Sequence, residues 1–124
     1  MRLFRTVAIF IMCVLACSVF AAAKQNQFGV ADKRNLELFV PTWVGGVLLP
    51  VGDYVVLHTM EGQDHIMVFK QINKSKAAEA RVKCQLVPLA KAAPGDEQIF
   101  TVNPANERVL HTLVFKGDSA QHVF

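Results

Sequence analysis

A strict two-residue alternation of apolar and polar side chains constrains the fold of this chain more than any other feature, and it is clearest over residues 80–87. The apolar members of the alternation are Val82, Cys84 and Leu86, and the polar members are Arg81, Lys83 and Gln85. Successive side chains of a β-strand point to opposite faces of the sheet, so this pattern predicts a strand with one buried face and one wet face. No segment of the chain has a convincing helical period, and residues 75–81 allow one helical turn at most.

Other short β-rich segments follow one another at a regular spacing, separated by turn signals rich in glycine, proline and asparagine. The predicted strands cover residues 36–40, 43–49, 54–60, 65–72, 80–87, 98–102, 108–116 and 120–124, with a tight hairpin at Gly45-Gly46 and the longest loop at 88–97. Such spacing is typical of all-β domains. The sequence therefore predicts a single small antiparallel sandwich or partly closed barrel of seven to eight strands.

The N-terminus has the features of a secretory signal peptide. Arg2 and Arg5 precede an apolar stretch over residues 6–16, and small residues follow at 21–23. The apolar stretch is shorter than the ~20 residues that a membrane-spanning helix needs. We expect cleavage after about Ala23, which makes the working protein periplasmic or secreted.

This prediction divides the chain into a signal peptide at 1–23, a flexible leader at 24–34 and an antiparallel β domain at 35–124. An alternative is a lipoprotein anchored at Cys17, because a small residue, Ala16, precedes that cysteine. Good conventional cleavage sites lie just downstream, so cleavage near residue 23 is the preferred interpretation.

Removal of residues 1–23 takes away two of the 13 basic side chains and none of the 10 acidic ones, which leaves a net charge of +1. No cluster of lysine or arginine remains, so nucleic acid is not an expected partner. Cys84 is then the only cysteine, which excludes an intramolecular disulfide. Its place in the alternation predicts a buried structural cysteine.

Residue types that catalysis needs are scarce. The serines after residue 23 are Ser75 and Ser119, and both lie in polar turns without a neighbouring histidine. The glycine pair at 45–46 leads to no helix, so it is not a phosphate-binding loop. We therefore expect a protein that is not an enzyme and has no cofactor, with a small envelope hydrolase as a second alternative.

One candidate metal site follows from hairpin geometry. A turn at 62–63 places His58 opposite Met67 and Met60 opposite His65, so that all four side chains share one face. Imidazole and thioether groups together suit copper. His58, His65, Met60 and Met67 are therefore the candidate ligands, and the alternative is that the methionines simply fill the core.

The last hairpin repeats this geometry. A turn at 117–118 places His111 opposite Phe124 and His122 opposite Leu113, which makes the two histidines diagonal neighbours. Their surroundings in the sequence are apolar and offer no soft ligand. We expect them to be structural histidines of the sheet.

The segment at 46–56 follows the pattern Gly-x-x-Leu-Pro-x-Gly-x-Tyr-x-Val. Its defining residues are Gly46, Leu49, Pro50, Gly52 and Tyr54. With the strands that follow, over residues 35–124, it resembles short exported all-β proteins of uncharacterised activity that are common in soil acidobacteria. The resemblance implies export and a β-sandwich, and it carries over no catalytic residue. Physically, proline and glycine would reverse the chain, and the tyrosine would anchor the next strand.

These observations predict an exported, non-enzymatic β domain with a binding or structural role at the cell envelope. A periplasmic copper-binding protein is the first alternative. The segments 54–60 and 109–115 are apolar on both faces, which suggests a closed barrel, a covering loop or self-association. A protein partner on that apolar face or on an edge strand is therefore expected, and an integral membrane span is not.

Overall fold

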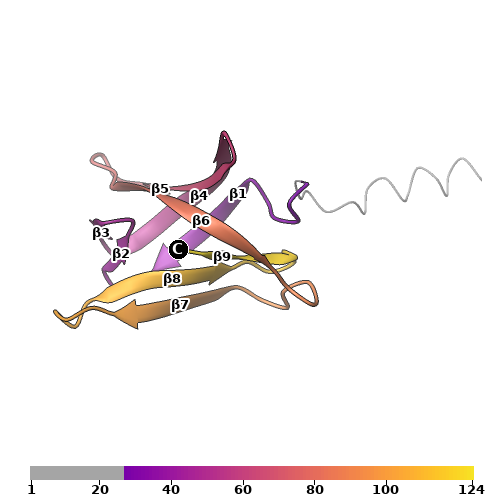
Figure 1. The fold of residues 1–124 in the computed structure, drawn as a ribbon. Helices are drawn as coiled ribbons and strands as arrows, with labels where there is room; N and C mark the ends of the chain where they lie inside the picture. The colour runs from indigo at the N-terminus through magenta and orange to yellow at the C-terminus, as the bar shows by residue number, and fades with distance from the viewer. Residues whose placement is uncertain (1–26) are drawn as a thin grey trace, which may run out of the picture.

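The computed structural model describes residues 27–124, and the predicted signal peptide and Cys17 lie outside this range. Every regular element within it is a strand (Figure 1). The strands are β1 (Lys33–Leu38), β2 (Thr42–Val44), β3 (Val47–Leu49), β4 (Gly52–Glu61), β5 (Asp64–Gln71), β6 (Glu79–Pro88), β7 (Glu97–Val102), β8 (Arg108–Val114) and β9 (Ala120–Val123). No helix in this part of the chain has the length and apolarity that crossing a bilayer demands.

Hydrogen bonding joins the strands in the order β1-β4-β5-β6-β9-β8-β2-β3. Strand β7 lies outside this order and pairs with β8. All pairings are antiparallel except that of β2 with β8. The architecture is an open, sandwich-like sheet that does not close into a barrel, so the predicted all-β antiparallel fold is confirmed. The described residues form nine strands, more than predicted, because the segment at 43–49 divides into β2 and β3.

The strands lie in two layers, one with β1, β4 and β5 and the other with β7, β8 and β9 (Figure 1). Strand β6 belongs to both layers. Its first part pairs with β5 up to Cys84, and its second part pairs with β9 from Gln85 onward. In Figure 1 it crosses from the layer of β1, β4 and β5 to the layer of β7, β8 and β9. Cys84 therefore lies at the point where one strand changes partners.

The core fills the space between the layers, and the predicted alternation holds along β6. Cys84 is buried and Val82 and Leu86 are half-buried, while the polar members of the alternation are exposed. The buried apolar cluster consists of Leu36, Leu38, Val44, Leu49, Tyr54, Val56, Met67, Phe69, Ala80, Cys84, Leu110, Leu113 and Phe115. Burial of apolar area on this scale is the main stabilising force of a small domain without disulfides.

The turn residues take the conformations that the sequence suggests. Gly45 and Gly46 have φ angles of 56° and 82°, which a two-residue hairpin between β2 and β3 requires. After β3, the hydroxyl of Tyr54 donates a hydrogen bond of 2.6 Å to the carbonyl oxygen of Pro50. Tyr54 is fully buried, so this bond ties the start of β4 to the turn before it.

Strand β8 is buried on both faces at Thr112, Leu113 and Val114. Val114 lines a cleft of about 680 Å³ together with the loop at 89–96. The loop at 89–96 therefore lies beside this strand, with the cleft between them.

The described residues before β1, 27–32, are held against the sheet by backbone hydrogen bonds. Ser119 donates its backbone N–H to the carbonyl oxygen of Gly29 over 2.8 Å, and His58 donates to that of Asp32 over 2.8 Å. Val30 between them is fully buried. The segment 24–34 is predicted to be a flexible leader because most of its residues are polar. In the structure, Val30 within it is buried, and β1 begins at Lys33.

Candidate functional site

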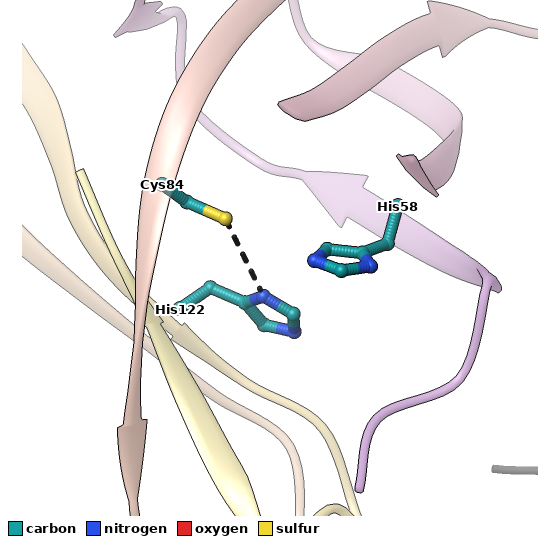
Figure 2. A group of neighbouring side chains, drawn as sticks. All are labelled: His58, Cys84 and His122. Carbon is teal, nitrogen blue, oxygen red and sulfur yellow. Dashed lines mark hydrogen bonds between the residues drawn. The ribbon is translucent and has the colours of Figure 1, made fainter. Parts of the chain in front are cut away.

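Four strands bring three histidines and the buried cysteine together. His58 lies on β4, His65 on β5, Cys84 on β6 and His122 on β9. Figure 2 shows the side chains of His58, Cys84 and His122 pointing toward one another in the space between the strands. The change of partners along β6 is what allows one thiol to meet histidines from both layers.

The distances within this group suit a shared ion. The Sγ atom of Cys84 lies 3.9 Å from Nδ1 of His122, and the candidate ligand atoms of His58, Cys84 and His122 all lie within 4.8 Å of one another. Bonds of about 2.3 Å to sulfur and about 2.0–2.1 Å to nitrogen would place two ligand atoms roughly 3.3–3.8 Å apart in tetrahedral or trigonal geometry. The distance from Sγ of Cys84 to Nδ1 of His122 is therefore close to that of two ligands of one metal ion, and small side-chain movements would bring His58 to the same ion.

His65 extends the group toward the surface. Its Nδ1 atom lies 3.2 Å from Nε2 of His58, so one ring donates a hydrogen bond and the other accepts it. The two rings stack with centroids 5.2 Å apart, and the ring of Phe28 meets His65 edge-on at 4.7 Å. His65 is half-buried. It can serve as a fourth ligand or as the outer partner that orients His58.

A carboxylate stands behind His122. Oδ2 of the fully buried Asp118 lies 3.9 Å from Nε2 of His122, while its Oδ1 accepts a hydrogen bond of 2.5 Å from Arg34. The thiol and the carboxylate therefore face opposite nitrogens of one ring. Metal-binding histidines usually donate a hydrogen bond from the second nitrogen to a carboxylate, and Asp118 is placed on that side of His122 although 3.9 Å is longer than a hydrogen bond.

Burial shifts the pKa values of His58, Cys84 and His122 and so determines their protonation at neutral pH. Desolvation lowers the pKa of His122 to about 4, and desolvation together with the neighbouring His65 lowers the pKa of His58. Desolvation raises the pKa of Cys84 to about 11. At neutral pH both imidazoles are uncharged, which is the form that binds metals, and a metal ion would have to displace the thiol proton.

Two clefts reach the group from outside. One, of about 280 Å³, is lined by His65 and Cys84. The other, of about 490 Å³, is lined by His58 and Met60. A small ion therefore has a short path to ligands that are themselves only 1–7% exposed.

The four metal ligands proposed from the sequence lie on two neighbouring strands, His58 and Met60 on β4 and His65 and Met67 on β5. The predicted register holds, with His58 opposite Met67 and Met60 opposite His65. His58 and His65 come together, whereas Met67 is buried in the core and Met60 is 39% exposed. Sequence reasoning did not place Cys84 in this group, although its inward position was expected.

The two histidines of the last hairpin differ in burial, since His122 is buried and His111 is exposed. Leu113 does lie opposite His122, as expected. The expectation that only apolar groups surround His122 is wrong, because the pairing of β6 with β9 brings the Cys84 thiol to it. His111 is exposed, and its Nδ1 lies 2.7 Å from the hydroxyl of Thr112.

Cys84, His122 and Asp118 also lie in the order of a nucleophile, a base and an orienting carboxylate. A working nucleophile needs a thiol that ionises readily beside its base. Burial instead raises the pKa of the Cys84 thiol to about 11, so the thiol stays protonated at neutral pH although it lies within hydrogen-bond distance of Nδ1 of His122, at 3.9 Å. The arrangement therefore suits metal ligation better than nucleophilic catalysis.

Comparison of the chain with protein-family models, with curated proteins and with solved structures gave no match.

Proposed function

We propose that this chain is an exported, non-enzymatic β domain that binds one transition-metal ion. His58, Cys84 and His122 are its ligands. The observation that carries the proposal is the convergence of these three donors, buried and within 4.8 Å of one another, from three strands. A thiol and two imidazoles form a donor set that suits zinc and copper and does not suit magnesium or calcium.

The setting supports this function. Buried imidazoles and a buried thiol are costly unless their polar atoms find partners. A metal ion would satisfy all three at once. The signal-peptide features at residues 1–23 support export, and this would bring the domain to metal ions outside the cytoplasm.

Fewer observations support the other candidate functions, a structural or partner-binding role and a hydrolase. A structural or partner-binding role at the envelope would use exposed apolar side chains such as Phe39, Val51 and Val102, which lie on different segments. A hydrolase would need an accessible nucleophile, and Cys84 is buried. Metal binding is the function for which the described residues supply a complete set of donors.

Equilibrium dialysis of the purified chain against Zn(II), and against Cu(I) under reducing conditions, tests the proposal. We expect one ion per chain. His58→Ala, Cys84→Ala and His122→Ala should each weaken binding by more than the 10–100-fold that loss of an outer partner costs.

The matched control is His111→Ala, which removes an exposed histidine outside the group and should leave binding unchanged. Circular dichroism checks that each variant is folded. No uptake by the folded parent chain, or equal uptake by all variants, would contradict the proposal.

A further inference from the structure

The donor set narrows the choice of ion. Two imidazoles and one thiolate in a plane, with a weak thioether donor along the axis, form the ligand set of copper sites that transfer single electrons. The described residues supply the two imidazoles and the thiol. A thioether in the right place would therefore distinguish a copper site from a zinc site.

Met67, although part of the core, is the candidate for this donor because of its place in the strand register. It lies directly opposite His58 on the neighbouring strand β5. His65, two residues before Met67, lies directly opposite Cys84. Directly paired residues share a face, as do residues two apart, so Met67 is on the same face as His58 and is the diagonal neighbour of Cys84. Met67 is only 1% exposed and belongs to the same buried cluster as Cys84.

We infer that the ion is copper, held in the plane of His58, Cys84 and His122, with the Met67 thioether as a weak fourth donor. The site takes up one electron from an external one-electron donor, which reduces Cu(II) to Cu(I). It returns that electron to a one-electron acceptor. No bond between the protein and the metal breaks, and no proton is transferred. This inference rests on the proposed function and adds the identity and the chemistry of the ion.

The protein around the proposed copper site suits reversible one-electron oxidation and reduction of the ion. The ligands lie on β-strands of the packed domain, so the geometry changes little between the two oxidation states. Burial of Cys84 prevents two chains from joining through a disulfide, which is the usual outcome when Cu(II) meets an exposed thiol. His65, in hydrogen-bond distance of His58 and at the wall of a cleft, links the site to the surface.

Visible absorption and electron paramagnetic resonance of the purified chain with added Cu(II) sulfate test the inference. We expect an intense visible band from thiolate-to-copper charge transfer. Ascorbate should bleach the band and ferricyanide should restore it. Cys84→Ala should abolish the band, and the control His111→Ala should retain it.

Met67→Leu separates the role of the thioether, since leucine has nearly the same volume as methionine and is well tolerated in a packed core. We expect this variant to keep the band and to have a raised reduction potential. An unchanged potential would remove Met67 from the ligand set.

The possible failures can be told apart. Binding of Zn(II) or Cu(I) at one ion per chain, without a thiolate band for Cu(II) or without reversible bleaching, would overturn the copper inference alone. Failure of the folded chain to bind any of these ions would overturn both proposals.

Discussion

Oδ2 of Asp118 lies 3.9 Å from Nε2 of His122, on the side of the ring away from the Cys84 thiol. This oxygen is buried and has no hydrogen-bond partner among residues 27–124. The carboxylate favours a proton on Nε2, which leaves Nδ1 free to face the sulfur and an ion. In the proposed metal site, Asp118 would therefore act as a positioning residue for His122.

Replacement of Asp118 by asparagine should weaken metal binding by about 10–100-fold, because the amide preserves the shape of the side chain and removes the charge behind His122. Competition with a chelator of known affinity measures this change. Equal affinity of Asp118→Asn and the parent chain would show that the carboxylate has no role in ligation.

The hydroxyl of Tyr54 should contribute to stability and not to metal binding. Tyr54→Phe removes the hydrogen bond to the carbonyl of Pro50 and should lower the free energy of unfolding by about 1–2 kcal/mol. Urea denaturation measures the loss, and metal affinity should stay the same. A variant as stable as the parent would mean that the turn at 50–53 is held by packing alone.

The two glycines of the β2–β3 hairpin should respond differently to alanine. Both have positive φ angles, so each alanine carries a strain of about 1–2 kcal/mol. At Gly45 a Cβ atom would also lie 2.9 Å from the Cβ of Val82 and 3.0 Å from the carbonyl oxygen of Arg81, whereas at Gly46 it would meet nothing within 4 Å. Gly45→Ala should therefore be the more destabilising by about 1 kcal/mol or more.

Thermal and urea denaturation of the two variants, purified side by side, measure the difference. Equal losses of stability would contradict the close packing of this hairpin on β6.

Acid should destabilise the metal-free chain. Burial lowers the pKa of His122 from its ordinary 6.5 to about 4 in the folded chain, so below pH 6.5 the unfolded chain binds a proton that the folded chain does not. Stability should thus be constant above pH 6.5 and fall toward pH 4, by at most about 3 kcal/mol. The lowered pKa of His58 acts in the same direction, and the raised pKa of Asp118 opposes it at the acid end.

Burial is the main cause of the lowered pKa of His122, and the charges of His58, His65 and Arg34 lower it further. Cys84 and Asp118 also face the His122 ring, each at 3.9 Å. Urea denaturation in the presence of a chelator, from about pH 7.5 to about pH 4, measures the profile. His122→Gln should flatten it, and His111→Ala should not. A parent profile without a slope in this interval would mean that His122 is protonated in the folded chain.

Local sequence rules predicted the all-β character of the domain, the approximate positions of its strands and two hairpin registers, while the bounds of β1 and the number of strands differ from the prediction. The turn at 62–63 and the period of two determine that His58 faces Met67, and the turn at 117–118 determines that Leu113 faces His122. Each of these pairings joins neighbouring segments of the chain. Their geometry follows from turn length and from the alternation of side chains.

The candidate site could not be assembled in that way. Cys84 and His122 are 38 residues apart, and they meet because β6 leaves β5 and pairs with β9. Nothing in the local pattern specifies which distant strand becomes a neighbour, since any amphipathic strand with a suitable face could pair there. The alternation predicted an inward thiol, and only the topology gave it histidine neighbours.

X-ray absorption spectroscopy of the zinc-loaded chain tests the central claim most directly, because it reports the atoms bound to the ion. The account predicts one sulfur at about 2.3 Å and at least two imidazole nitrogens at about 2.0–2.1 Å, with the sulfur lost in Cys84→Ala. A shell of nitrogen and oxygen without sulfur in the parent chain would contradict it.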